Sequence, residues 1–438
     1  MIASGGPSKP APDPQSTPAN PVGGLETWGI ESGRAADVFS PSELSRGLTF
    51  AGFFWMLAIA AILGHRAYAP LLLLPLAVID WRHAYYARRA TFRRLDRGWL
   101  LYFASAAVIC FYTVLSALWS PLPQRADWGL RLSLCFALAP FAYHAVSYLS
   151  PAARARAAAG MAWASLAMLA LLLFEAATNA GIRRFLPPDQ HISRDIISLG
   201  RGSLLLVLLV WPARRIFHMQ LRRPLIGLAL IVLAAIPAVR FTIVTNAVML
   251  GTGAVGLVWG FLFKARGVAL LFAGAVALVW LTPLVAILMP TDTVLVWAQD
   301  LPDSWVQRIH IWDRAGAEIL THPFGGGVGY SRSLTDAMEM VTINGVKLNT
   351  MPLHPHNLFL HVWLDLGVIG ALGLSGLIIA AYLGARGAVA GGGAGVICAI
   401  AASLLVTAMT EWSVWQIWRF AAVWIALIAW RLSGPSMR

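Results

Sequence analysis

Long apolar runs separated by short basic segments make up most of the chain. They recur between residues 47 and 289 and again between 356 and 432. A helix that crosses a hydrocarbon core of about 30 Å needs about 20 apolar residues. The 438 residues therefore leave room for about twelve such helices. We predict an all-α, polytopic integral membrane protein.

The apolar runs set the predicted spans. Spans one to nine fall within residues 47–289 and spans ten to twelve within 356–432. The individual predictions are 47–64, 67–81, 99–119, 128–149, 160–179, 196–210, 224–239, 244–263, a ninth span that ends near 289, then 356–383, 395–409 and 415–430. Short basic segments, such as the one around Arg154 and Arg156, are expected to be hinges between spans. We found no internal repeat.

One long segment, residues 290–355, departs from this pattern. It is polar, mixed in charge and rich in His, Gly and Trp. We predict a large loop that carries short helices. A membrane protein that keeps one large hydrophilic insert is expected to place its chemistry there.

Charge assigns the sides of the membrane. The chain has 58% hydrophobic and only 12% charged residues, with a net charge of +13. The basic residues lie in clusters between apolar runs, as in residues 82–97, so they indicate topology rather than nucleic-acid binding. Both termini are then cytoplasmic, and the 290–355 loop faces the periplasm. Residues 1–46, rich in Pro, Gly and Ser, are predicted to be disordered, and 433–438 form a short tail.

His356 is the first candidate for chemistry, because it follows Pro355 at the start of an apolar run. An unperturbed imidazole has a pKa of about 6.5, which suits a general base. An interfacial His that anchors the helix is the alternative. His354 lies close enough to form a pair, but no third ligand follows at metal-site spacing, so no metal is expected. His361 is expected to face elsewhere and to be structural.

Arginines on the predicted outer face are the second candidate group. Arg201 lies at the mouth of span six, Arg240 interrupts a pair of spans, and Arg308 opens a helical pattern in the loop. Arginine binds phosphate through two parallel charge-assisted hydrogen bonds. Several arginines around one His indicate a site for a substrate with a pyrophosphate leaving group. Snorkelling to the interface explains Arg201 and Arg240 equally well.

The glycine-rich run at residues 325–329 lacks a GK[ST] ending and does not follow a strand. A nucleotide site is therefore not expected. We interpret the run as a flexible hinge.

Several motifs together resemble the O-antigen ligase family. His356-Asn357, followed by Gly367 and Gly370, is similar to that family's His-[Asn/Ser/Gln]-x9-Gly-x-x-Gly signature. Arg201-Gly-Ser-Leu-Leu205 is similar to its Arg-x-x-x-Leu motif. Arg308, with Trp312 and the segment from His322 to Gly329, resembles the arginine-bearing part of its large periplasmic loop.

The resemblance implies a fold and an activity. Members are GT-C-like, metal-independent glycosyltransferases of the bacterial inner membrane that need no cofactor. They transfer O-antigen polysaccharide from undecaprenyl pyrophosphate to a hydroxyl of lipid A–core, so membrane lipids and these two substrates are the expected partners. Carried over, His356 would be the base, and Arg201 and Arg308, with Arg240 less certain, would hold the pyrophosphate.

Further residues are assigned to the acceptor or to support of the base. These are Asn357, His354, Arg183 and Arg184, the two arginines lying in the outer segment 181–202. An O-antigen polymerase and a protein O-oligosaccharyltransferase use the same donor and remain alternatives. A transporter of a lipid-linked glycan would need ionisable residues deep in several spans, and the mid-span regions hold almost none.

Overall fold

The computed structural model describes residues 41–79, 96–185, 192–241, 243–335 and 340–434. Helices make up nearly all of this part of the chain, with one two-stranded hairpin. Seven described helices are long and apolar enough to cross a membrane, and two shorter ones, α8 and α14, are apolar as well. The structure is therefore that of an all-α membrane protein, and twelve spans remain a prediction.

The helices follow the predicted apolar runs. Their bounds are α1 Pro41–Leu63, α2 Tyr68–Leu71, α4 Arg97–Leu115, α5 Ala126–Ala145, α6 Pro151–Ala177, α7 Ile192–Met219, α8 Pro224–Arg240, α9 Thr245–Leu288, α10 Thr291–Trp297, α11 Asp303–Thr321, α12 Tyr330–Ser333, α13 Leu358–Ala388, α14 Ala394–Thr410 and α15 Ile417–Ser433. The α9 range contains a break at Lys264, where φ is 48°. The break agrees with the predicted boundary between spans eight and nine.

Three predictions about the spans are wrong. The second predicted span is not one helix, because α2 covers four residues and the next helical turn covers only Leu74–Val78. The expected hinge at Arg154 and Arg156 is helical, since Pro151 starts α6 and the Ser150 side chain accepts a hydrogen bond from the Ala153 N–H. Residues 41–46, expected to be disordered, belong to α1. The expected disorder of 1–40 and the loop at 82–95 lie outside the described residues.

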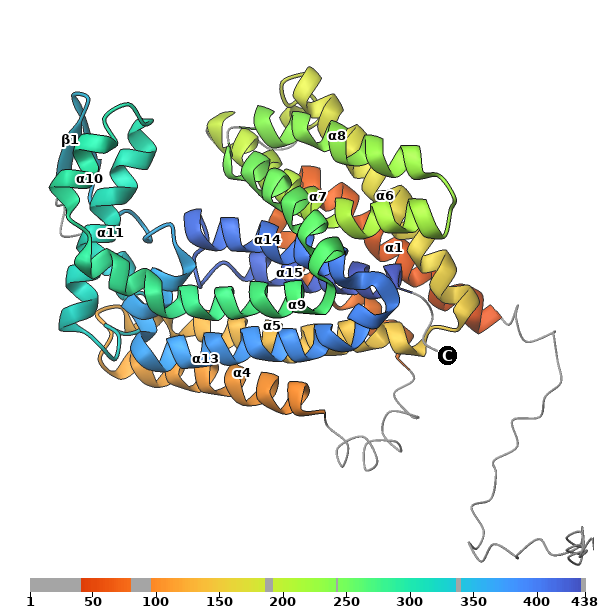
Figure 1. Ribbon diagram of the computed structural model, residues 1–438, viewed down its shortest axis with the longest axis horizontal. Coiled ribbons are helices and arrows are strands. Elements are labelled where there is room, and N and C mark those ends of the chain that lie inside the picture. Colours follow the sequence, from red (N-terminus) through yellow and green to blue (C-terminus); the bar gives the residue numbers. More distant parts are fainter. Residues whose placement is uncertain (1–40, 80–95, 186–191, 242, 336–339, 435–438) are drawn as a thin grey trace, which may run out of the picture. The chain divides into compact units, whose positions relative to one another are not determined.

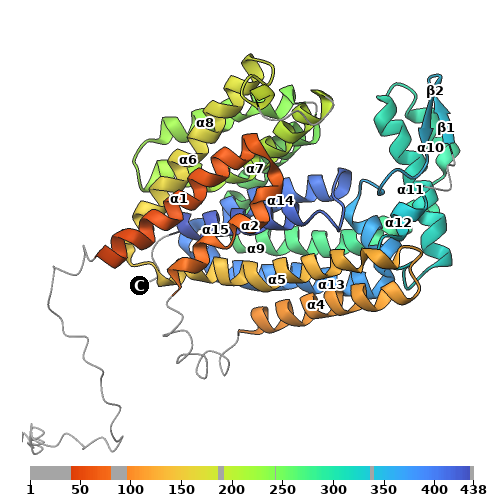
Figure 2. The ribbon, with the colours of Figure 1, turned by 180° about the vertical axis from the view of Figure 1, so that it is seen from behind.

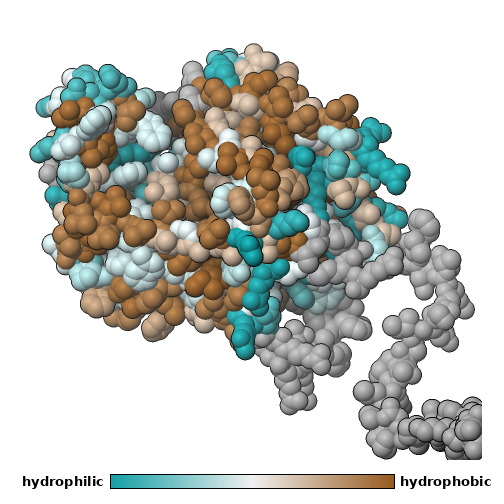
Figure 3. All heavy atoms as spheres, in the orientation of Figure 1, coloured by the Kyte–Doolittle hydropathy of each residue, from teal (hydrophilic) through white to brown (hydrophobic). Residues whose placement is uncertain are grey.

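The helices pack in two groups joined by the C-terminal pair. Helices α1, α6, α7 and α8 contact one another, and α4, α5, α9 and α13 form the second group, visible in both ribbon views (Figures 1 and 2). Helix α14 packs on α9 and α7, and α15 packs on α5 and α7. Hydrophobic side chains cover much of the helical surface, and hydrophilic ones gather at its ends (Figure 3). Both groups thus expose the apolar flanks expected of spans.

The polar segment 290–355 forms a small cap beside the helices. It holds α10, α11, α12 and an antiparallel hairpin of β1 (Met340–Ile343) and β2 (Val346–Asn349). The hairpin turns at Asn344-Gly345, both with positive φ, as a two-residue turn requires. The short helices were predicted, and the hairpin was not.

A break in α13 is the feature that organises the site. At Gly367 the backbone has φ 55° and ψ −152°, so the helix stops and restarts in a new direction. The carbonyl oxygens of Leu364 and Asp365 then accept hydrogen bonds from the N–H groups of Gly326 and Gly327, at 2.8 and 3.0 Å. The glycine run at 325–329 is therefore packed against the break in α13 and hydrogen-bonded to it. The interpretation of this run as a flexible hinge is wrong.

Gly367→Ala is expected to destabilise the protein, because an added Cβ would lie 2.2 Å from the carbonyl carbon of Phe324. The strained φ alone costs on the order of 1–3 kcal/mol. Gly384→Ala, in the same helix with no atom near the added Cβ, is the control and should be neutral or slightly stabilising. Thermal unfolding in detergent measures both. Equal midpoints for the two variants would contradict this account of the break.

Candidate functional site

Three histidines lie together where the cap meets α13. The rings of His354 and His356 are 4.4 Å apart, and those of His354 and His361 are 5.8 Å apart and parallel. His354 Nδ1 accepts a hydrogen bond from the backbone N–H of His356 at 3.1 Å. His356 itself has φ 53°, an uncommon conformation for a residue with a side chain. The loop thus holds His356 in a fixed, strained position beside His354.

Burial and positive neighbours keep the imidazoles of His354 and His356 neutral. Burial, then the charges of Arg308 and Arg419, lowers the pKa of His356 from its ordinary 6.5 to about 4. Burial also lowers the pKa of His354 well below the ordinary value, with further contributions from His356, His361 and the same two arginines. A neutral imidazole has a free lone pair at neutral pH, so His356 has the protonation state that a general base requires.

A buried carboxylate, that of Asp365, contacts His361 of this histidine group. Asp365, fully buried on α13, accepts hydrogen bonds from the N–H groups of Gly329 and Ser331 and from the Trp415 indole, at 3.0, 2.8 and 2.7 Å. His361 Nε2 lies 3.3 Å from the same carboxylate and 2.9 Å from the Ser331 hydroxyl. Asp365 therefore ties the cap, α13 and the loop before α15 into one unit.

Arg201 is held by aromatic neighbours in the N-terminal half of α7. Its NH1 group donates to His65 Nε2 at 3.1 Å, and its guanidinium lies 5.9 Å from the centre of the Trp418 ring. Burial and nearby arginines lower the pKa of His65 to about 3, so this ring is neutral and accepts the hydrogen bond. Arg201 keeps its charge within a mostly buried setting.

A second arginine, Arg419, also lies against Trp418. Its guanidinium is 4.7 Å from the Trp418 ring, and it donates to Glu411 at 3.1 Å, to Gln416 at 2.6 Å and to Thr407. Its side chain is only 6% exposed. Glu411 also accepts from the Thr245 hydroxyl at 3.0 Å. Arg201 and Arg419 therefore both contact the Trp418 ring.

Arg308, on α11, completes the positive group. Its NH1 group donates to the Ser304 carbonyl at 2.9 Å, its guanidinium lies 5.1 Å from the Trp305 ring, and its Nε has no partner within the described residues. Burial lowers its pKa, and the negative charge of Glu411 opposes that change. Glu411 acts on Arg201 as well. One carboxylate thus lies among three arginines, which leaves the site positive.

Breaking the Arg419–Glu411 pair is expected to destabilise the protein. Arg419→Gln leaves Glu411 without its cation in a partly buried site, a change that typically costs about 3–5 kcal/mol. The double variant Arg419→Gln, Glu411→Gln removes both charges and should recover most of that loss. Thermal unfolding of the wild type and both variants measures this. A double variant no more stable than Arg419→Gln alone would show that the pair is not the cause.

The structure separates the other predicted residues from this group. Arg240 is exposed at the end of α8 and donates to the Asn179 side chain at 3.4 Å, so the structure does not bring it to the histidines. Arg183 is bound to Asp195 at 2.8 Å and to the Leu63 carbonyl at 2.6 Å, so its guanidinium is already engaged. Arg184 is exposed beside it.

Asn357 has a structural role at the start of α13. Its side-chain oxygen accepts hydrogen bonds from the N–H groups of Phe359 and Leu360, at 2.9 and 3.2 Å, so it caps the N-terminus of α13. The predicted start of this helix at His356 is two residues early. Because the cap fixes the first turn, it also fixes the loop that carries His356.

Sequence reasoning missed several members of the site. Asp365 stands four residues after His361 on one helix, the spacing of a side-chain pair, and that signal was available. The expectation that His361 faces elsewhere is wrong, because its ring lies 5.8 Å from that of His354. Arg419 and Glu411 are charges at the edge of an apolar run, the same signal that identified Arg201. His65 lies between the first two predicted spans, where the sequence carries no signal of a site residue. Among the described residues, no group of three or more His, Cys, Asp or Glu side chains is arranged to hold a metal ion.

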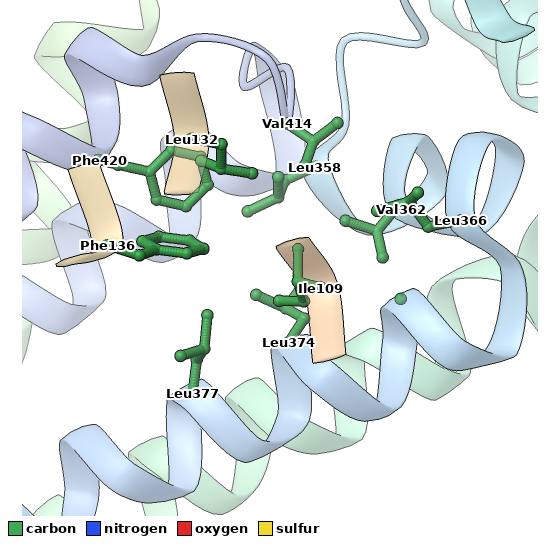
Figure 4. A pocket seen from close by; sticks show the side chains of 11 residues that line it. Ile109, Leu132, Phe136, Leu358, Val362, Leu366, Leu374, Leu377, Val414 and Phe420 are labelled. Carbon is green, nitrogen blue, oxygen red and sulfur yellow. The ribbon is translucent and has the colours of Figure 1, made fainter. Parts of the chain in front are cut away.

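An apolar pocket lies next to the histidine loop. Val362 and Leu366 face it from the first segment of α13, and Leu374 and Leu377 from the second, so the break at Gly367 brings both segments to one pocket (Figure 4). Helices α4, α5 and α15 supply the remaining walls. The helix that follows the histidine loop, α13, therefore also lines the apolar pocket.

Comparisons with known proteins match a limited part of the chain. A protein of Rickettsia conorii named "Putative polysaccharide ligase" is 31% identical over 96 residues, which are 20% of this chain and 23% of that protein. Its namesake in Rickettsia typhi is 38% identical over 69 residues, 15% of this chain and 17% of that protein. A protein of Rickettsia felis with the same name is 30% identical over 96 residues, which are 20% of this chain and 24% of that protein.

The chain thus matches less than a quarter of the length of each of these relatives. No family model matches it. These partial similarities support a relationship to a polysaccharide-ligase-like family.

Proposed function

We propose that this protein is a glycosyltransferase that moves a glycan from a polyprenyl pyrophosphate to a hydroxyl group. The observation that carries the proposal is a neutral histidine pair, His354 and His356, on which the charges of Arg308 and Arg419 act. Arg419 also pairs with Glu411 and shares the Trp418 ring with Arg201. Arginines suit the two phosphates of the leaving group. A neutral imidazole suits the hydroxyl of the acceptor.

The reaction follows from these groups. His356 takes the proton of the acceptor hydroxyl as its oxygen attacks the anomeric carbon of the donor sugar. The bond from that carbon to the pyrophosphate oxygen breaks, and the polyprenyl pyrophosphate leaves with its electron pair. The arginines stabilise the charge that develops on the leaving group. Attack from the opposite face inverts the anomeric centre, so a product with retained configuration would contradict this step.

Donor binding should strengthen the base. In the free protein, burial and then the charges of Arg308 and Arg419 lower the pKa of His356 to about 4. A bound pyrophosphate places negative charge near these arginines and so weakens their effect on the ring. The pKa of His356 then rises toward neutral pH, where a base works best. The protein would therefore activate the acceptor only after the donor is in place.

The donor and acceptor are proposed from the sequence motifs and from the names of the partial relatives. The donor is O-antigen polysaccharide on undecaprenyl pyrophosphate, the acceptor is lipid A–core, and the site faces the periplasm of a bacterial inner membrane. His354 supports the base. Arg308 sits on the cap, so the cap is proposed to cover the donor.

A transfer assay tests this function. Purified protein in detergent with EDTA receives undecaprenyl-pyrophosphate-linked glycan and lipid A–core, and mass spectrometry identifies the products. Glycan attached to the core is the expected result. Longer chains on the lipid carrier, with the core unmodified, would identify a polymerase. No new glycosidic bond with either acceptor would reject the proposal.

A further inference from the structure

A second positive site lies at the other end of α15. Arg419 and Arg431 are twelve positions apart on this helix, which is about 18 Å along its axis. Helix α5 ends and α6 begins at the same end, at Ala145 and Pro151. This site is therefore separate from the histidine group.

Two arginines meet there. Arg431 donates to the Tyr143 carbonyl at 3.0 Å and to the Ser147 hydroxyl at 2.8 Å, with its guanidinium 4.6 Å from the Tyr143 ring. Arg154 donates to the Arg431 carbonyl, and its buried Nε has no partner within the described residues. The two positive charges lie close enough to act on each other.

Their partners are uncharged, unlike those of several other arginines among the described residues. Arg131, Arg183, Arg314 and Arg419 each form an ion pair with a carboxylate. For Arg154 and Arg431, the hydrogen bonds within the described residues go only to backbone carbonyls and one hydroxyl. Two adjacent, partly buried guanidinium groups without a carboxylate favour an anion with several oxygens.

The surroundings place this anion at a membrane boundary. The Tyr143 ring packs against Trp99 and Trp424, each 6.1 Å away between ring centres. Trp and Tyr gather where apolar helices meet the headgroup region. Basic sites between helices at that depth bind anionic headgroups. We propose that Arg154 and Arg431 bind the phosphodiester of an anionic phospholipid at the junction of α5, α6 and α15.

The test uses the full chain in detergent and compares unfolding midpoints with added phosphatidylglycerol or phosphatidylcholine. Phosphatidylglycerol should raise the midpoint of the wild type more than phosphatidylcholine does. The double variant Arg154→Gln, Arg431→Gln should lose more than half of that difference. The control Arg266→Gln, Arg386→Gln removes two exposed arginines and should keep it.

Two outcomes would overturn the proposal. If both double variants lose the same part of the lipid difference, the lipid responds to the overall charge of the protein. If inorganic phosphate raises the unfolding midpoint as much as phosphatidylglycerol does, the site binds the free ion. If the glutamine variant does not fold, Arg154→Lys, Arg431→Lys keeps the charge without the planar fork. It should then keep less than half of the lipid difference, and an undiminished difference would also overturn the proposal.

Discussion

The His356→Ala variant is expected to transfer glycan at least about 100-fold more slowly than the wild type, and up to about 10⁴-fold more slowly. The side chain is proposed to accept the proton of the attacking hydroxyl, and alanine cannot. Binding of the donor should change little, because the arginines that hold the pyrophosphate remain. Initial rates at saturating donor and acceptor, together with the donor Kd, measure both quantities.

His218→Ala is the matched control. This residue is exposed at the C-terminal end of α7, the helix that carries Arg201 at its other end. It should transfer at the wild-type rate. If His356→Ala were also active at more than a tenth of that rate, His356 would not be the base, and His354 would become the residue to test.

Arg308→Ala is expected to lower the transfer rate by about 10²–10³, the usual loss for one removed donor that stabilises developing charge. It should weaken donor binding too, because Arg308 is proposed to contact the pyrophosphate before and during bond breaking. Arg308→Lys keeps the charge without the fork and should recover only part of the activity. Rates and the donor Kd, measured for all three proteins, separate these contributions.

Arg314→Ala serves as the control for that series. It lies six positions further along α11 and pairs with Glu318 at 2.8 Å, away from the histidines. It should keep nearly full activity. Equal losses for Arg308→Ala and Arg314→Ala would mean that α11 only needs its charge or stability, and the phosphate assignment would fail.

The fold was predictable wherever one physical rule dominated. Apolar length alone located most helices, including α8, whose bounds differ from the prediction by one residue at its C-terminus. It failed at residues 67–81, where an apolar composition hides a series of short turns. Apolarity measures the environment of a segment, and it does not report where the backbone turns. The hairpin at 340–349 was missed because its strands are only four residues long, although Asn344-Gly345 between alternating apolar residues is a hairpin signal.

The site was predictable only in part, because its members come from distant segments. His356 and Arg308 carried recognisable motifs, and the charges of Arg308 and Arg419 both act on His356, but no motif linked Arg419 to the other two. Arg240 had the same sequence signal as Arg201, yet it faces outward. The difference lies in the packing of Arg201 against His65 and Trp418, a contact between segments more than 100 residues apart. No local pattern encodes such a contact.

The break at Gly367 shows the same limit in another form. The glycine run at 325–329 and Gly367 were both visible, but only their hydrogen bonds reveal that one caps the other. Glycines in a sequence indicate where the backbone can adopt an unusual conformation, but they do not indicate which other segment it packs against. Here the partner of the glycine run is the break in α13, next to Asp365, which lies beside His361. The run therefore supports the site through the backbone.

The most direct test of the account is the pKa of His356, measured by NMR with ¹³C-labelled histidine and assigned by comparison with His356→Ala. In the free protein it should be about 4. With saturating geranyl pyrophosphate, a short analogue of the donor, it should rise above that value, because added negative charge offsets Arg308 and Arg419, while burial, the largest cause of the low pKa, remains. A pKa that stays at about 4 while the analogue is bound would contradict a pyrophosphate site beside this histidine.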